Sequence, residues 1–337
     1  MKALILEANE QPLVFKDVAV PTVSTETVLV NIHTAGLNHR DVWIQKGQYA
    51  GLKYPIILGS DGAGTVVEVG NQKNKDLVNQ TVIINPSLEW GDNEGFQGKN
   101  YTILGLPQDG TFTEYVAVPS KNVYLKPQHL DIDQAAALPL AGLTAYRALV
   151  TRGKVQPNEK VLITGIGGGV ALFAMQFAVA LGAKVYVTSG SDEKLERVKK
   201  MGVVQGVNYK KEGWAKDLQK EVGNFDLIID GAGGQDFTKL IDLAISGGRI
   251  VSYGATRGAI PEFALTKIFW KQLTISGSTM GSDKDFAEML QLVNKHKIIP
   301  ILDKVFLLAY GERAMQRMEQ GEQFGKIVLD CRPLLMK

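Results

Sequence analysis

The sequence contains a single cysteine, Cys331, among its 337 residues, which excludes an internal disulfide and a cysteine-rich zinc site. It also lacks an excess of charge of either sign, because 37 Lys and Arg residues are balanced by 35 Asp and Glu residues. A net charge of +2 gives no strong field to hold a polyanion. We therefore do not expect nucleic acid to be the main partner.

Long hydrophobic segments are equally scarce. Residues 161–183 carry no charge and have the length of a membrane span, but a cluster of glycines interrupts them. A buried strand, a tight turn and a buried helix explain this stretch better than a membrane helix. Glu7 and Glu10 stand where a signal peptide needs an unbroken apolar run. We expect a cytoplasmic protein that neither crosses nor binds a membrane.

The chain length and the ordinary globular composition predict two domains. Residues 1 to about 122 consist of short apolar runs separated by turn residues and predict a mostly-β domain, in which glycines mark bulges and bends. From about Val161, strand-like and helix-like segments alternate as βαβαβα. This alternation predicts an α/β domain with one parallel sheet.

Two further segments flank the α/β region. Residues 131–151 predict a helix that begins at Asp131 or Asp133, is interrupted at Pro139 and resumes around residues 145–150. Residues 309–330 predict a helix, a turn and a strand. This last strand could return to the first domain, because nothing in its pattern ties it to the parallel sheet.

The most informative motif is a glycine-rich turn between a strand and a helix, with the spacing Gly165-x-x-Gly168-x-x-Ala171. Small residues there allow a tight turn and let a pyrophosphate approach the N–H groups that begin the helix. A tight turn with no ligand is the alternative. The residues expected to contact the phosphates are Gly165, Gly167, Gly168, Gly169 and Val170.

The end of the next strand predicts which dinucleotide is bound. An acidic residue there favours NAD, because it binds the ribose 2′-hydroxyl and repels the 2′-phosphate of NADP. The chain has Ser189 and Ser191 instead, followed by Lys194, so NADP(H) is favoured. In the alternative interpretation Lys194 is simply solvated, and Asp192 and Glu193 cap the helix.

Two more loops at the carboxyl ends of predicted strands contain glycine. We expect Gly231 and Ala232 in one loop, and Gly254 and Ala255 in the other, to contact the cofactor. Asp230, directly before the first loop, is expected to be structural.

These segments together resemble the medium-chain dehydrogenase/reductase superfamily, and within it the zinc-free quinone oxidoreductase-like branch. The matching motifs follow the order of that family over nearly the whole chain. They are Gly36–Asp41, Gly59–Gly64, Pro139–Tyr146, Gly165–Ala171, Ser189–Lys194, Val207–Tyr209, Gly254–Thr256 and Gly325–Leu329.

The resemblance implies a GroES-like catalytic domain at residues 1–122, completed by residues 299–337, and a doubly wound Rossmann NADP-binding domain at residues 123–298. It further implies that Thr144 lies beside the nicotinamide and that Lys194 and Tyr209 bind the 2′-phosphate. By the same resemblance, His39 and Lys326 also contact the cofactor.

Metal ligands of the zinc alcohol dehydrogenases in this superfamily are missing. Their two Cys residues and their Gly-His-Glu motif correspond here to Asn38, Leu140 and Gly59-Ser60-Asp61. Zinc needs three protein ligands of N, S or O type, and one carboxylate does not make a site. We therefore expect no metal.

Without a Lewis acid to activate an alcohol, the favoured reaction is hydride transfer from NADPH to a quinone, an enone or a similar activated carbonyl acceptor. By position, Asn38 and Tyr49 are expected to hold the acceptor oxygen, and Asp41 to orient the local network. Tyr49 could instead only pack against the wall of the site. A non-catalytic NADPH-binding sensor and a zinc-type alcohol dehydrogenase-like enzyme remain alternatives.

An unprotected edge strand predicts a homodimer. Residues 273–278 contain a short β-prone run that would form the outermost strand of the parallel sheet. The unpaired N–H and C=O groups of such an edge can pair with a second copy across a two-fold axis. A covering loop or C-terminal segment is the alternative.

Overall fold

The computed structural model describes residues 1–260, 262 and 264–333, which divide into two compact domains. We call Met1–Ala141 together with Gly281–Lys337 the β-rich domain, and Gly142–Met280 the Rossmann domain. No helix among the described residues is both long enough and apolar enough to cross a membrane.

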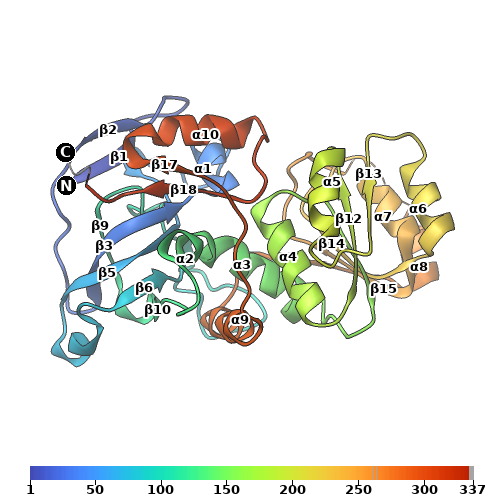
Figure 1. Ribbon diagram of the computed structural model, residues 1–337, viewed down its shortest axis with the longest axis horizontal. Coiled ribbons are helices and arrows are strands. Elements are labelled where there is room, and N and C mark those ends of the chain that lie inside the picture. Colours follow the sequence, from blue (N-terminus) through green and yellow to red (C-terminus); the bar gives the residue numbers. More distant parts are fainter. Residues whose placement is uncertain (261, 263, 334–337) are drawn as a thin grey trace. The chain divides into compact units, whose positions relative to one another are not determined.

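The Rossmann domain contains one parallel six-stranded sheet in the order β13-β12-β11-β14-β15-β16 (Figure 1). Its strands are β11 (Lys160–Ile163), β12 (Lys184–Ser189), β13 (Gln205–Asn208), β14 (Phe225–Asp230), β15 (Ala244–Ser252) and β16 (Thr274–Gly277). This is the strand order of a dinucleotide-binding sheet, numbered 3-2-1-4-5-6 within the domain. The predicted parallel sheet and its outermost strand are thus confirmed.

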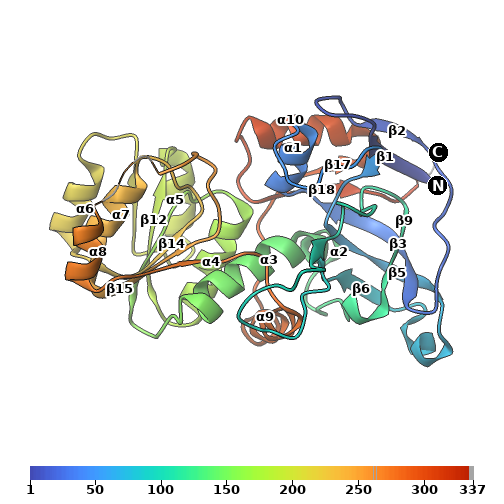
Figure 2. The same cartoon turned by 180° about the vertical axis from the view of Figure 1, so that it is seen from behind.

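Helices cover both faces of this sheet, α4 and α5 on one face and α6, α7 and α8 on the other (Figures 1 and 2). Their bounds are α4 (Gly169–Ala180), α5 (Asp192–Lys199), α6 (Trp214–Val222), α7 (Phe237–Leu243) and α8 (Leu265–Lys271). The apolar side chains of the central strand β11 and most of those of α4 are buried. The glycine-interrupted stretch 161–183 therefore forms a strand, a turn and a buried helix, as predicted.

The β-rich domain is built around β3, which pairs with β5, β9 and β18 in a seven-stranded sheet. The strands of this sheet are β3 (Thr27–Gly36), β5 (Asp61–Val69), β6 (Thr81–Ile84), β9 (Tyr115–Pro119), β10 (Val123–Leu125), β17 (Leu302–Leu307) and β18 (Lys326–Asp330). Strand β18 lies between β3 and β17, so the C-terminal strand does return to the first domain.

Two smaller sheets complete this domain. One contains β1 (Lys2–Leu6), β2 (Val14–Asp17) and β4 (Ile56–Ile57), and the other contains β7 (Ser87–Leu88) and β8 (Thr102–Ile103). The expected bulges occur where β3 pairs with β5, near Gly64. A Cβ atom on Gly64 would lie 2.0 Å from the carbonyl oxygen of Asn31, so only glycine allows the two strands to approach this closely.

The remaining helices are α1 (His39–Gln45), α2 (Ile132–Ala137), α3 (Pro139–Tyr146), α9 (Asp283–His296), α10 (Gly311–Glu319) and a π-helical segment at Arg147–Arg152. Short 3₁₀ turns lie at Gln72–Leu77, Ser120–Asn122 and Leu308–Tyr310. As predicted, Asp131 caps α2: its carboxylate accepts from the Gln134 N–H at 2.7 Å. The second helix begins at Pro139, not near residue 145, because proline fits the first position of a helix.

The domain division differs from the boundaries expected at residues 122 and 299. Strand β10 pairs with β6, and α2 packs against β5, β3 and β18, so residues 123–141 belong to the β-rich domain. Helix α9 joins the same domain: the ring of Phe286 lies 4.7 Å from that of Tyr124, and Asn85 Nδ2 donates to Asp283 at 2.9 Å. The sequence pattern could not reveal these contacts, because each one joins distant segments.

Candidate functional site

The topology of the β-rich domain brings three polar residues together at one end of β3. Asn38 lies two residues after the end of β3, Asp61 begins β5 and Lys326 begins β18. Because β5 and β18 both run antiparallel to β3, the start of each lies beside its end: Gly36 pairs with Asp61 and also with Val328. We call Asn38, Asp61 and Lys326 the polar centre.

The polar centre is buried and densely hydrogen-bonded. The Lys326 ammonium donates to the Leu37 carbonyl and to Asn38 Oδ1, both at 2.6 Å, and to Asp61 Oδ2 at 2.9 Å. The Asn38 amide Nδ2 donates to the same Asp61 oxygen at 3.0 Å, and the Leu140 N–H donates to Asp61 Oδ1 at 2.7 Å. Each charge therefore has an opposite charge and further hydrogen bonds, which a buried ion pair requires.

A second group of side chains lies next to the polar centre in the sequence. Arg40 is buried and donates through Nη1 to Ser60 Oγ at 2.7 Å and to the Leu104 carbonyl at 2.9 Å. Its guanidinium carbon lies 5.1 Å from the centroid of the Tyr49 ring. Tyr49 is half-buried and stacks on Arg40. The structure therefore shows the packing role of Tyr49, and contact with an acceptor stays a prediction.

Asp41 is fully buried at the start of α1, and its Oδ2 accepts from the Asn38 N–H at 2.8 Å. Its other oxygen, Oδ1, has no partner among the described residues. Burial raises the pKa of Asp41 to about 6, although the positive charge of Arg40 opposes the shift. Asp41 thus holds the backbone at Asn38, and its role in orienting a catalytic network stays a prediction.

The donor set does not fit zinc. Asn38 and Ser60 offer an amide and a hydroxyl, the only carboxylate is Asp61, and Lys326 already neutralises it. Among the residues that the structure describes, no group of three His, Cys, Asp or Glu side chains could hold a metal ion.

His39 and Lys326, the two residues of the β-rich domain that were expected to contact the cofactor, differ in solvent exposure. His39 is exposed at the beginning of α1. Lys326 is buried, and its ammonium is held by three acceptors of its own domain. Contact of either residue with a cofactor stays a prediction.

The glycine-rich turn of the Rossmann domain leads into α4 with an open side and an uncapped helix start, and phosphate binding by it stays a prediction. Gly165 and Gly167 have positive φ angles of +68° and +122°. Cβ atoms on Gly165 and Gly168 would meet no other described heavy atom within 4 Å, so space is open on that side of the turn. Gly168, the N-cap of α4, has no side chain to cap the helix. The N–H groups at Gly169 and Val170 therefore remain available to a phosphate.

The side chains expected at the 2′-phosphate gather around the end of β12. The aliphatic part of Lys194 lies against Gly167, and the Tyr209 hydroxyl lies against Gly190. The two serine hydroxyls are already engaged: that of Ser189 is 3.4 Å from the Ile166 carbonyl, and that of Ser191 caps α5 by accepting from the Lys194 N–H at 3.3 Å. Contact of Ser189, Ser191, Lys194 and Tyr209 with a 2′-phosphate stays a prediction.

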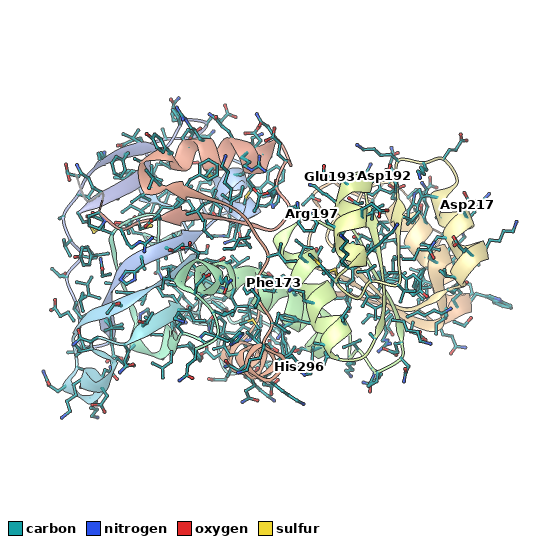
Figure 3. All side chains as sticks on the ribbon, in the orientation of Figure 1. Phe173, Asp192, Glu193, Arg197, Asp217 and His296 are labelled. Carbon is teal, nitrogen blue, oxygen red and sulfur yellow. The ribbon has the colours of Figure 1, made fainter. Side chains whose placement is uncertain are left out.

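Two acids follow the capping residue Ser191 at the start of α5. Asp192 and Glu193 lie in its first turn, with Arg197 further along the helix (Figure 3). Asp192 accepts from Asn208 Nδ2 at 3.0 Å. Asp192 and Glu193 therefore lie in the first turn of α5, where negative charge stabilises the helix, but Ser191 is the capping residue, and a cofactor role for Lys194 stays a prediction.

Sequence reasoning missed Arg257 in this region. Its guanidinium carbon lies 5.0 Å from the centroid of the Tyr209 ring, and Nη1 donates to Asp236 at 2.9 Å. Arg257 directly follows the predicted cofactor loop 254–256, which was the only signal for it. Its partner Tyr209 is 48 residues away, so the sequence could not indicate the stack.

The other expected cofactor residues lie in two loops and one helix of the same domain. Asp230 accepts from Thr164 at 2.6 Å and from the N–H groups of Ala232 and Gly233, so its structural role is confirmed. The two loops are hydrogen-bonded to each other, and the contacts of Gly231, Ala232, Gly254 and Ala255 with a cofactor stay predictions. Thr144 is buried in α3, with its hydroxyl 3.8 Å from the sulfur of Met280.

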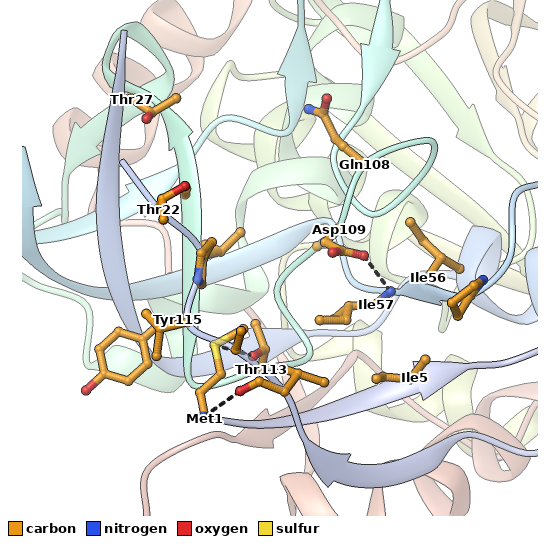
Figure 4. A pocket seen from close by; sticks show the side chains of 18 of the residues that line it. Met1, Ile5, Thr22, Thr27, Ile56, Ile57, Gln108, Asp109, Thr113 and Tyr115 are labelled. Atoms are coloured by element: carbon orange, nitrogen blue, oxygen red, sulfur yellow. Dashed lines mark hydrogen bonds between the residues drawn. The ribbon is translucent and has the colours of Figure 1, made fainter. Parts of the chain in front are cut away.

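A cavity of about 640 Å³ lies elsewhere in the β-rich domain (Figure 4). Ile5, Thr113 and Tyr115 line it, together with Asp109, which accepts from the Ile57 N–H at 3.0 Å. None of the predicted site residues lines this cavity, so it is distinct from the polar centre.

Two family models match the chain. The model described as "Alcohol dehydrogenase GroES-like domain" matches residues 24–128, and the model described as "Zinc-binding dehydrogenase" matches residues 169–295. They cover parts of the β-rich domain and of the Rossmann domain, in the order that the sequence motifs implied.

Individual relatives match almost the entire chain. "Zinc-type alcohol dehydrogenase-like protein YogA" of Leptosphaeria maculans is 36% identical over 95% of this chain and 94% of the relative. "Acryloyl-coenzyme A reductase" of Sulfurisphaera tokodaii is 28% identical over 98% and 99%. A crystal structure of an NAD-dependent alcohol dehydrogenase, 35% identical, has a TM-score of 0.91 over 98% of this chain and 99% of the other. The chain therefore belongs to the medium-chain dehydrogenase/reductase superfamily and is an NAD(P)-dependent oxidoreductase of that type.

Proposed function

We propose that the protein is an NADPH-dependent reductase of the zinc-free, quinone oxidoreductase-like type, which transfers hydride to a quinone, an enone or a similar activated carbonyl acceptor. The polar centre carries this proposal. At the positions of the catalytic zinc ligands it has an amide and a carboxylate, and the cation that neutralises the carboxylate is the ammonium of Lys326.

The polar centre lacks a set of side chains that fits zinc, and this favours reduction of a conjugated acceptor over oxidation of an alcohol. An unactivated alcohol needs a Lewis acid or a base to lose its proton, and the polar centre offers neither, because Asp61 is held by Lys326. Reduction of a conjugated acceptor needs only a hydrogen-bond donor at the oxygen where charge develops. Asn38 can supply such a donor through Nδ2.

The Rossmann domain is proposed to bind the cofactor through the N–H groups of the turn 165–170, with Lys194, Tyr209 and Arg257 at the 2′-phosphate. A bound reduced nicotinamide supplies the hydride. NADPH is preferred in this proposal because three side chains able to bind a phosphate gather at the end of β12, where the chain has no acid. Some relatives are named NAD-dependent, so this preference needs a direct test.

The name of one relative, acryloyl-coenzyme A reductase, supports a conjugated carbonyl compound as the hydride acceptor. Others are named alcohol dehydrogenases, which makes alcohol oxidation the competing activity. Both activities belong in one experiment.

The test measures nicotinamide absorbance with purified protein over quinones, enones, aldehydes and alcohols, with both phosphorylated and unphosphorylated cofactors. We expect NADPH oxidation with quinones or enones to exceed alcohol oxidation by at least about tenfold in kcat/KM, and to survive a chelator. Faster alcohol oxidation that a chelator abolishes would establish a zinc alcohol dehydrogenase instead. Tight NADPH binding with no turnover of any acceptor would indicate a non-catalytic sensor.

A further inference from the structure

The starting observation is that every hydrogen-bond donor of Lys326 has an acceptor within the polar centre. An ammonium group has three N–H donors, and three oxygens lie within 2.9 Å of Lys326 Nζ: the Leu37 carbonyl, Asn38 Oδ1 and Asp61 Oδ2. All three belong to the β-rich domain. The three N–H groups of the Lys326 ammonium are therefore all used inside the β-rich domain.

The same contacts determine which way the Asn38 amide faces. An ammonium can only donate and an ionised carboxylate can only accept. Lys326 therefore requires the carbonyl oxygen Oδ1 on its side, and Asp61 requires the amide nitrogen Nδ2 on the other side. Reversing the amide would place an N–H against the ammonium and an oxygen against the carboxylate, so only one orientation satisfies both charges.

This orientation has a consequence for chemistry. The oxygen of Asn38 accepts from Lys326 and faces that residue, whereas Nδ2 carries two hydrogens and Asp61 accepts one of them. The donor that remains on Asn38 is thus one N–H. A donor stabilises negative charge that develops on an acceptor oxygen.

We propose that Lys326 and Asp61 are positioning residues, which hold the Asn38 amide in one orientation and leave a single Nδ2–H to donate to the oxygen of the hydride acceptor. This role rests on the proposed function. It also differs from the cofactor contact that the sequence predicted for Lys326.

The first experiment separates positioning from cofactor binding. Lys326→Met should leave the calorimetric Kd for NADPH within about twofold of the wild-type value, because the ammonium donates only within the polar centre. Lys304→Met is the matched control, since Lys304 is an exposed lysine on the adjacent strand β17. A loss of NADPH affinity of tenfold or more in Lys326→Met alone would overturn the proposal.

Lys326→Met leaves Asp61 buried without its partner and could impair folding. The double variant Lys326→Met/Asp61→Asn removes both charges together, and the new amide can donate or accept, so it no longer imposes an orientation on Asn38. Folding of each variant is checked by circular dichroism and Tm before any other measurement.

The second experiment is a double-mutant cycle on hydride transfer to an enone. Asn38→Ala should lower kcat about a hundredfold, with KM for NADPH unchanged. The Lys326→Met/Asp61→Asn change should lower kcat about tenfold in the wild-type background and have almost no effect in the Asn38→Ala background, because it acts through Asn38. Equal effects in both backgrounds would overturn the positioning role and leave the proposed function intact. An unchanged kcat in Asn38→Ala would overturn the role of Asn38 itself.

A readout without turnover completes the test. The side-chain ¹⁵NH₂ pair of Asn38, assigned by its loss in Asn38→Asp, should have one proton whose chemical shift is moved downfield by its hydrogen bond to Asp61 and which exchanges slowly with solvent. In Lys326→Met/Asp61→Asn the chemical shift of that proton should move toward the value of a solvated amide, and it should exchange faster. Signals unchanged from wild type would overturn the proposal even if no acceptor were turned over.

Discussion

The guanidinium of Arg257 lies over the ring of Tyr209, with 5.0 Å between its Cζ atom and the ring centroid. Tyr209 in turn lies against Gly190, directly after β12. Arg257 also donates to Asp236 at 2.9 Å, so its charge is balanced within the Rossmann domain. The stack places a cation next to the strand end where a 2′-phosphate would be recognised.

Replacing Arg257 should therefore weaken NADPH binding selectively. We expect Arg257→Gln to raise the calorimetric Kd for NADPH about tenfold, or about 1.4 kcal/mol, and to change the Kd for NADH by less than twofold. Arg313→Gln is the control, because Arg313 stacks on Tyr310 in the β-rich domain at a similar 5.1 Å. Equal losses for both cofactors would show that Arg257 does not recognise the 2′-phosphate.

The end of β12 offers a second test of cofactor preference. The wild-type protein should bind NADPH at least about tenfold more tightly than NADH. A carboxylate introduced by Ser189→Asp would repel the 2′-phosphate and should shift the preference toward NADH. Ser189→Asn, which adds similar bulk without charge, separates repulsion from loss of the hydrogen bond to Ile166. If Ser189→Asp leaves the preference unchanged, Lys194, Tyr209 and Arg257 determine it.

Metal content gives a prediction about the polar centre. The purified protein should contain less than about 0.1 equivalents of zinc per chain by elemental analysis, because the only carboxylate at the former ligand positions, Asp61, is neutralised by Lys326. Activity toward quinones or enones should persist after treatment with a chelator. Zinc near one equivalent, together with activity that a chelator removes and zinc restores, would contradict the zinc-free interpretation.

Asp41 predicts a pH dependence of stability. Burial raises the pKa of its carboxyl from 3.8 to about 6 in the folded protein, so the folded state binds a proton more tightly than the unfolded state does. The resulting stabilisation is complete below about pH 4 and is lost as the pH rises through 6. A tenfold change in the acid dissociation constant corresponds to about 1.4 kcal/mol. Because the pKa rises from 3.8 to about 6, the free energy of unfolding falls by about 3 kcal/mol over this pH range.

The neutral variant Asp41→Asn should remove this loss. Relative to wild type, its free energy of unfolding should improve by up to about 3 kcal/mol between pH 4 and pH 8, as measured by urea denaturation across that range. Asp76→Asn, which alters an exposed carboxyl of the same domain, controls for the change of net charge. A difference between Asp41→Asn and wild type that does not vary with pH would contradict the prediction.

The sequence predicted the parts of the fold that depend on local pattern. The βαβ alternation, the turn at Gly165 to Ala171 and the cap at Asp131 depend on residues close together in the chain, and the structure has them where they were expected. The placement of Lys326 could not be predicted in this way. It depends on the pairing of β18 with β3, across almost 300 residues, which brings the ammonium to Asn38.

The same reason explains the other differences. Helix α9 follows the last parallel strand and has an ordinary amphipathic pattern, so its contacts with Tyr124 and Asn85, which are distant in the sequence, assign it to the β-rich domain. The stack of Arg257 on Tyr209 likewise joins two loops that are separate in the sequence. Sequence patterns show which chemical groups are present, whereas tertiary pairing decides which of them meet.

The edge of the parallel sheet supports a homodimer. Strand β16 pairs only with β15 among the described residues, and Ile275 on it is 37% exposed. The neighbouring helix α8, all seven residues of which the structure describes, buries none of them. Leu265, Phe269 and Trp270 on this helix are 67%, 61% and 81% exposed. So much apolar surface beside an open strand edge is typical of an interface.

A second copy of the chain should cover this edge, and light scattering at micromolar concentration should give a mass near twice 36.7 kDa. The Ser278 N–H donates to Ser252 at 2.8 Å, so by the alternation of a parallel strand the N–H of Ile275 points outward, toward the partner. Ile275→Pro removes that donor without breaking the pairing with β15 and should yield a folded monomer. Ile275→Lys should weaken the dimer by placing two charges in the interface, whereas Val305→Lys, at a similarly exposed position on the edge strand β17, should not. A wild-type monomer at micromolar concentration would contradict the homodimer, and a dimer that withstands both Ile275 variants would place the interface elsewhere.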